Sequence, residues 1–162
     1  MHAKHKLFLL YFILIANGIY SQKYVTAGGL RISKNELGLT LQQKILEHTT
    51  LELLAISNLD EYYFSVIPEF HNNILWGDGF NSYWGAGPRF GINNNDSSYF
   101  GGDLVFGVEY KMLLFPFVLS ADIKPGFRFQ EENWFELGAG ISFRYIFIKE
   151  KKKKLFSGKN NK

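Results

Sequence analysis

The sequence predicts an all-β protein in which eight antiparallel strands close into an up-and-down barrel. Eight segments alternate apolar residues with small or charged ones, and this period of two places successive side chains on opposite faces of a strand. Aromatic residues make up 17% of the chain, and 16 glycines interrupt it, which is typical of short strands joined by turns. The chain contains no cysteine, which excludes disulfides and thiol chemistry.

An N-terminal leader precedes the strands. Lys4 and Lys6 form a basic start, "LFLLYFILIANGIY" (Leu7–Tyr20) is an uncharged apolar run, and the small residue Ser21 follows it. This order is typical of a secretory signal peptide, cleaved here after Ser21. The alternative is a transmembrane anchor, but the run is shorter than the roughly 20 residues that a spanning helix needs. We therefore predict a signal peptide at residues 1–21 and one exported domain at residues 22–148.

The first four expected strands alternate with different regularity. They are Tyr24–Ile32, Leu37–Gln42, Thr49–Ser57 and Tyr62–His71. The third has an alternative, because "QQKILEHTTLELLAISN" (Gln42–Asn58) also fits an amphipathic helix.

The last four expected strands alternate more regularly. They are Trp84–Ile92, Phe100–Lys111, Phe117–Phe129 and Phe135–Phe147. Pieces rich in Asn, Asp and Ser separate several of the eight segments, and these residues favour turns. Such pieces are Ser33–Asn35, Asn58–Glu61, Asn93–Ser98 and Gln130–Asn133. Proline lacks the N–H that a closed ladder needs, so bulges or strand ends are expected at Pro68, Pro88 and Pro125.

The composition of the less apolar face indicates that it lines the barrel interior. That face is rich in Gly and Ser and carries six acidic and six basic residues. These are Arg31, Glu52, Glu69, Arg89, Asp103, Glu109, Lys111, Asp122, Lys124, Arg128, Glu136 and Arg144. Buried charges persist only when they are paired, so equal numbers of the two signs fit a filled lumen. Among these pairs, Arg128 is expected to meet Glu136 across the last turn.

The apolar face is expected to look outward into lipid. No charge falls mid-strand on that face, where an Arg or Lys at mid-bilayer would cost about 2–4 kcal/mol. Aromatic residues lie toward the strand ends, as in the interfacial girdles of outer-membrane barrels. The expected interfacial aromatics are Trp84, Tyr110, Phe129, Phe135, Tyr145 and Phe147. The alternative is that aromatic residues simply favour strands. The predicted fold is thus a transmembrane β-barrel with a lipid-facing apolar exterior and a charged, glycine-rich interior.

Several short motifs recur in a familiar order along the chain. They are "GLRI" (Gly29–Ile32), "GLTL" (Gly38–Leu41), "WGAGPRFG" (Trp84–Gly91), "GVEYKM" (Gly107–Met112), "SADIKPGF" (Ser120–Phe127) and "ISFRYIF" (Ile141–Phe147). Together they resemble a largely uncharacterised family of small outer-membrane β-barrel proteins of Bacteroidota-type Gram-negative bacteria. The resemblance implies eight strands, both mature termini in the periplasm and insertion by the outer-membrane assembly machinery. It implies no established activity.

The chain departs from that family in two places. Members often carry Trp before "KP" in the seventh strand, where this chain has Ile123. Barrels of this kind commonly end on an aromatic residue, whereas here residues 149–162 follow as a basic tail with seven lysines and one glutamate. The tail is interpreted as a solvated segment. The alternative is a contact with anionic lipid headgroups or acidic cell-wall polymer on the periplasmic side.

The sequence offers few candidates for chemistry. His48 and His71 lie near strand ends and are interpreted as polar interface residues rather than catalytic or metal-binding ones. No phosphate-binding glycine loop, hydrolase signature or metal-ligand spacing occurs, so no cofactor is expected. The lumen carboxylates are interpreted as members of a salt-bridge lattice rather than as an acid–base pair.

We therefore expect a non-enzymatic outer-membrane protein with a structural or interaction role and without a through-pore. Its expected partners are outer-membrane lipid and, during biogenesis, the assembly machinery. Nucleic acid is not expected as a partner, because the basic charge lies in the tail and the barrel region is acidic. A monomer is expected. Two alternatives stay open: a lipid-modifying or small apolar ligand-binding barrel, and a soluble periplasmic lipocalin-like binder.

Overall fold

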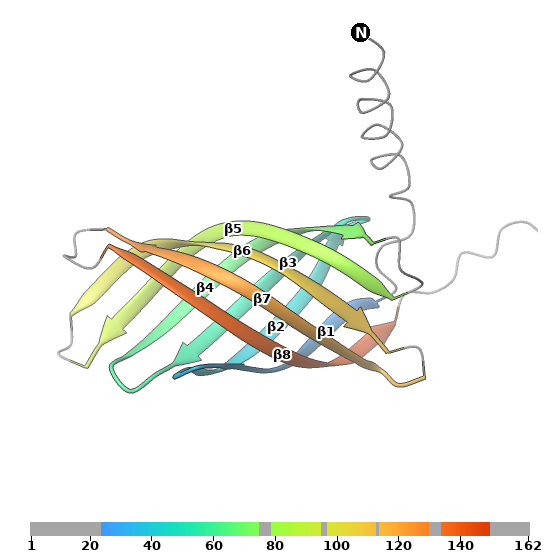
Figure 1. Cartoon of the computed structure of the whole chain (residues 1–162), viewed down its shortest axis with the longest axis horizontal. Helices are drawn as coiled ribbons and strands as arrows, with labels where there is room; N and C mark the ends of the chain where they lie inside the picture. Colours follow the sequence, from blue (N-terminus) through green and yellow to red (C-terminus); the bar gives the residue numbers. More distant parts are fainter. Residues whose placement is uncertain (1–23, 75–78, 95–96, 113, 130–133, 150–162) are drawn as a thin grey trace, which may run out of the picture.

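The computed structural model describes residues 24–74, 79–94, 97–112, 114–129 and 134–149. They form eight strands: β1 (Tyr24–Ser33), β2 (Leu37–Leu46), β3 (Thr49–Ser57), β4 (Glu61–Asn73), β5 (Phe80–Asn93), β6 (Ser98–Lys111), β7 (Phe117–Arg128) and β8 (Phe135–Lys149). Each strand pairs antiparallel with the next, and β8 pairs with β1 (Figure 1). The predicted eight-stranded, up-and-down, closed barrel is therefore confirmed.

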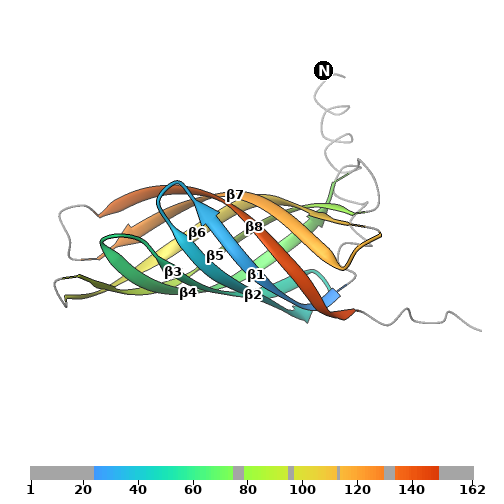
Figure 2. The same cartoon turned by 90° about the horizontal axis from the view of Figure 1, so that it is seen from below.

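The barrel has two distinct ends. Tyr24 pairs with Lys149, so β1 starts and β8 finishes at the same end, which we call the terminal end. The β1–β2, β3–β4, β5–β6 and β7–β8 connections lie at the opposite end, which we call the loop end. The strands run obliquely to the long axis in both views (Figures 1 and 2), the tilt that closing a sheet into a barrel requires.

Burial alternates along the strands as the sequence pattern predicts. In β4 the odd-numbered residues from Glu61 to His71 are buried, while Tyr62, Phe64 and Phe70 are exposed. The helical alternative for residues 42–58 is wrong, because β3 pairs with both β2 and β4 over its whole length. No helix that could cross a membrane occurs in the described part of the chain.

The interior is not only charged and glycine-rich, as the sequence suggested. Two apolar clusters also fill it. The larger consists of Leu54, Ile56, Tyr63, Ile67, Tyr83, Tyr99 and Val105. The smaller consists of Ala27, Val118 and Ile146. Apolar side chains therefore share the barrel interior with the ionic groups.

The three strand prolines lie within β4, β5 and β7, so the expectation of bulges or strand ends is wrong. A residue in an antiparallel strand directs its N–H toward one neighbouring strand only. Each proline therefore removes a donor from one ladder and keeps its pairing on the other side. Pro68 pairs with Leu51 in this way, and Pro125 pairs with Leu137.

The predicted leader and tail lie largely outside the described residues. The described chain begins at Tyr24, after the predicted cleavage site, and β8 continues to Lys149, the first residue of the predicted tail. The barrel that positions the interior side chains is thus described from its first strand to its last.

Candidate functional site

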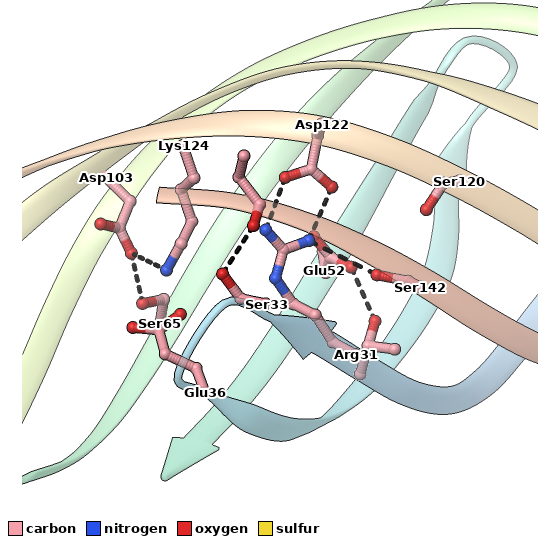
Figure 3. A network of polar contacts seen from close by, with 12 residues as sticks. Arg31, Ser33, Glu36, Glu52, Ser65, Asp103, Ser120, Asp122, Lys124 and Ser142 are labelled. Carbon is pink, nitrogen blue, oxygen red and sulfur yellow. Dashed lines mark hydrogen bonds and ion pairs between the residues drawn. The ribbon is translucent and has the colours of Figure 1, made fainter. Parts of the chain in front are cut away.

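The barrel interior holds a lattice of charged side chains, and its central element is a bidentate ion pair between β1 and β7. Arg31 Nη1 and Nη2 each donate to one carboxylate oxygen of Asp122 at 2.6 Å. Ser142 Oγ lies 3.4 Å from Arg31 Nη1 (Figure 3). Tyr83 donates its hydroxyl to the Asp122 carboxylate at 2.8 Å. Arg31 and Asp122 are 1% and 7% exposed. This pair therefore joins strands on opposite sides of the closure seam between β1 and β8.

A second buried arginine lies closer to the terminal end. Arg144 on β8 forms an ion pair with Glu52 on β3 through Nη2. Its Nε donates to Thr40 Oγ1 at 2.9 Å, and its Nη1 donates to Ser120 Oγ at 2.8 Å. All three guanidinium nitrogens thus have partners, on β2, β3 and β7. Such saturation is what makes a buried charge tolerable.

His71 is an interior residue, so its interpretation as an interface histidine is wrong. The residue is 1% exposed, and its ring stacks on Tyr83 at a centroid distance of 5.4 Å. Its Nε2 lies 3.4 Å from Glu69 Oε2, and its Nδ1 lies 3.6 Å from Glu109 Oε1. Thr50 Oγ1 lies 2.8 Å from Nε2. His71 therefore fills the terminal end of the lumen between two carboxylates.

This group places a hydroxyl, an imidazole and a carboxylate in the order used by hydrolytic triads. The geometry does not offer a reactive group, because Thr50 is fully buried and the same imidazole nitrogen also faces Glu69. Among the described residues, no group of three or more His, Asp or Glu side chains could hold a metal ion. The arrangement packs polar groups against one another inside the barrel.

The loop end of the lumen contains a chain of ion pairs from five strands. Arg89 lies 2.8 Å from both Asp103 and Glu136. Arg128 lies 3.1 Å from Glu136, the contact expected across the β7–β8 turn, and 2.7 Å from Glu61. The Glu136 side chain is 32% exposed, so this cluster reaches from the closed interior to the mouth of the barrel.

Lys124 and Tyr63 connect this cluster to the centre of the barrel. Lys124 Nζ donates to Tyr63 Oη at 2.7 Å and lies 3.5 Å from Asp103. Ser65 donates to the same carboxylate at 2.6 Å (Figure 3). The Arg89 guanidinium carbon lies over the Tyr63 ring, 4.1 Å from the ring centroid, and forms a cation–π contact with it.

The twelve residues singled out from the sequence thus fall into recognisable places. Nine of them take part in the Arg and Lys ion pairs described above, and Glu69 and Glu109 join them through His71. Lys111 is half-buried at the terminal end of β6, opposite Val118. Sequence reasoning missed Glu61, which belongs to the inward face of β4 but was read as part of a turn. Extending the odd-numbered pattern of β4 by one step would have found it.

Several aromatic residues of the outer face form two groups near the ends of the barrel. Phe127, Phe129, Trp134 and Phe135 gather near the loop end, with ring contacts such as Phe127–Phe135 at 5.6 Å. Near the terminal end, Phe70 meets Trp84 at 4.9 Å, Phe80 meets Tyr110 at 4.5 Å, and Tyr145 meets Phe147 at 5.5 Å. All six expected interfacial aromatics are on the outer surface in these two groups.

Comparisons with known proteins show what the architecture is similar to. No family model matches the chain, and no curated protein matches it. Among solved structures, the barrel is similar to the N-terminal β-barrel domain of Pseudomonas aeruginosa OprF, with a TM-score of 0.63 and 17% sequence identity. The match covers 78% of this chain and 99% of that chain. What the two share is the fold.

Proposed function

We propose that this protein is an outer-membrane β-barrel of a Gram-negative bacterium, with a structural or interaction role and without enzymatic activity. The observation that carries the proposal is the inverted distribution of side chains. Arg31, Arg89, Arg144 and Lys124 are among the most buried residues, whereas Phe, Leu, Ile and Trp side chains cover the outside. Water would favour the opposite arrangement, and hydrocarbon favours this one.

The filled lumen supports the absence of a through-pore. Ion pairs and buried tyrosines cross the interior at the terminal end, in the centre and at the loop end. An eight-stranded barrel is just wide enough for its side chains to fill it. We propose that the described lumen stabilises the barrel and that any partner binds at the loop end or on the outer surface.

The same distribution argues against the two alternatives. A lipocalin-like binder needs an apolar, empty interior, and here charged groups and their partners occupy that space. A lipid-modifying enzyme needs a reactive group that its substrate can reach, and the buried Thr50 and His71 do not provide one. The resemblance to Bacteroidota outer-membrane barrels stays a prediction, as do the signal peptide and the periplasmic termini.

Fractionation and gel migration test the proposal. Cells expressing the full chain are separated into soluble and membrane fractions, and the detergent extract is run on a gel before and after boiling. We expect outer-membrane fractionation and a different migration of the unheated sample, because a closed barrel resists detergent until it is heated. A freely soluble protein without a shift would overturn the proposal and favour the lipocalin-like alternative.

A further inference from the structure

Two of the seven ladders between consecutive strands are interrupted where the prolines lie. In the β4–β5 ladder, all of whose residues are described, pairing stops after Ser65–Arg89 and resumes at Glu69–Gly85. In the β6–β7 ladder, again within described residues, it stops after Asp103–Gly126 and resumes at Phe106–Ile123. Pro68 and Pro88 lie in the first interruption and Pro125 lies in the second. The missing N–H groups account for both.

The two interruptions flank one hairpin at the same height. The β5–β6 ladder is continuous, and within it Pro88 pairs with Gly102. The loop-end part of this hairpin is therefore held on one side by five residue pairs to β4 and on the other by three pairs to β7. Gly101–Asp103 and Gly126–Arg128 make up the short β7 attachment, together with a hydrogen bond from Phe129 N to Phe100 O at 2.9 Å. Three pairs and one further hydrogen bond form a short connection in a barrel wall.

Asp103 joins this hairpin to its neighbours across both interruptions. Its carboxylate accepts a hydrogen bond from Ser65 on β4 at 2.6 Å and lies 3.5 Å from Lys124 Nζ on β7 (Figure 3). Arg89 on β5 lies 2.8 Å from its other oxygen. Ionic and hydrogen-bond contacts made by one buried side chain thus stand where backbone hydrogen bonds are lost.

An outer groove borders the second interruption at Leu104 and extends over the loop-end pairs. It has a volume of about 550 Å³, and its lining includes the outward residues Leu104, Phe127 and Trp134 together with the inward residues Asp103 and Arg128. Gly102 forms part of its floor, and a Cβ there would meet only a carbonyl oxygen at 3.6 Å. The groove therefore borders the residues that make up the short β7 attachment.

We propose that the barrel opens laterally between β6 and β7 at this interruption, and that Asp103 is the residue that keeps the opening closed. When the three loop-end pairs separate, the groove becomes continuous with the polar lumen beside Lys124. That the outside phase is lipid rests on the proposed function. The opening itself is argued from the two interrupted ladders and from the contacts of Asp103. The opening lets a molecule bound in the outer groove contact the polar groups beside Lys124 without passing the loops.

Amide hydrogen exchange of the folded full-length barrel tests the opening. In Asp103→Asn, exchange at Gly101–Asp103 and Gly126–Arg128 should accelerate roughly tenfold to a hundredfold, the factor expected for losing a hydrogen bond to a charged group. Exchange at Phe106–Lys111 should stay unchanged. Asp122→Asn is the matched control, because Asp122 is also a buried carboxylate but pairs with Gly107 beyond the interruption and with Gly140 in the continuous β7–β8 ladder. Unchanged exchange, or the same uniform acceleration in both variants, would overturn the proposal.

An engineered disulfide provides a test that does not depend on the stability of Asp103→Asn. Gly102 and Phe127 are paired across β6–β7, and the natural chain contains no cysteine. Oxidised Gly102→Cys/Phe127→Cys should slow exchange at Gly101 and Arg128 relative to its reduced form. The pair Phe106→Cys/Ile123→Cys, beyond the interruption, should not. Equal exchange in the oxidised and reduced forms of the first pair would show that the strands do not separate. Fractionation tests membrane location independently of either result.

Discussion

Replacing Arg144 with Met should cost much of the barrel's stability, because it leaves Glu52 as a buried charge without its ion-pair partner. Both side chains are at most 1% exposed. The substitution also removes the donors to Thr40 and Ser120. Breaking a buried pair by removing one partner costs about 3–5 kcal/mol, and we expect the free energy of unfolding to fall by that amount.

The double variant separates the cost of the unpaired charge from that of lost packing. Arg144→Met/Glu52→Gln removes both charges and keeps an oxygen that accepts from Thr40. We expect it to recover most of the stability lost in the single variant, because replacing both partners of a buried pair is often close to neutral. Lys34→Met, at an exposed turn, is the control and should change stability by less than about 0.5 kcal/mol.

Urea titration in lipid vesicles, followed by gel migration of unheated samples, measures these differences. A loss below about 1 kcal/mol in Arg144→Met would mean that the charge reaches water and that the lumen is not sealed at this level. A double variant as unstable as the single one would assign the loss to side-chain packing. Either result would refute the argument from an unpaired buried carboxylate.

Three further predictions concern other parts of the barrel. Gly29→Ala should lower the free energy of unfolding by about 1–3 kcal/mol or more, because a Cβ there would lie 1.9 Å from a β8 carbonyl oxygen. Gly138→Ala is the control and should be neutral in the same urea titration, because the nearest atom to its Cβ would be 3.5 Å away. Ile123 points outward at mid-strand, so Ile123→Arg should lower the free energy of unfolding in vesicles by about 2–4 kcal/mol. Leu59→Arg, in the β3–β4 turn, should change it little. Equal small effects of the two substitutions would indicate an exterior that faces water. His71→Phe should lower stability by about 1–3 kcal/mol, since its polar neighbours lose their partner, and an unchanged urea midpoint would exclude this role.

The sequence predicted the faces of the strands better than the contacts between them. Alternation is local, so Arg31, Glu52 and Arg144 could be placed inside from their own segments. Their partners could not be chosen in this way, because Arg31 meets Asp122 at a separation of 91 residues and Arg144 meets Glu52 at 92. Those contacts depend on the register of several ladders and on closure. The Arg128–Glu136 contact was predictable because one turn joins the two residues.

The positions of the prolines also could not be interpreted from the sequence alone, because their effect depends on the register between strands. Pro68 and Pro88 are far apart in the sequence, and each alone suggests a local defect in its own strand. The register places both in the single β4–β5 interruption, so two missing donors weaken one seam rather than two. Pro125 weakens the other side of the same hairpin, while the ladder inside the hairpin stays continuous. All three prolines therefore weaken the pairing of one hairpin, β5–β6, with its neighbours. The buried Asp103 carboxylate contacts the strands on both sides of that hairpin, and we propose that it keeps the hairpin in place.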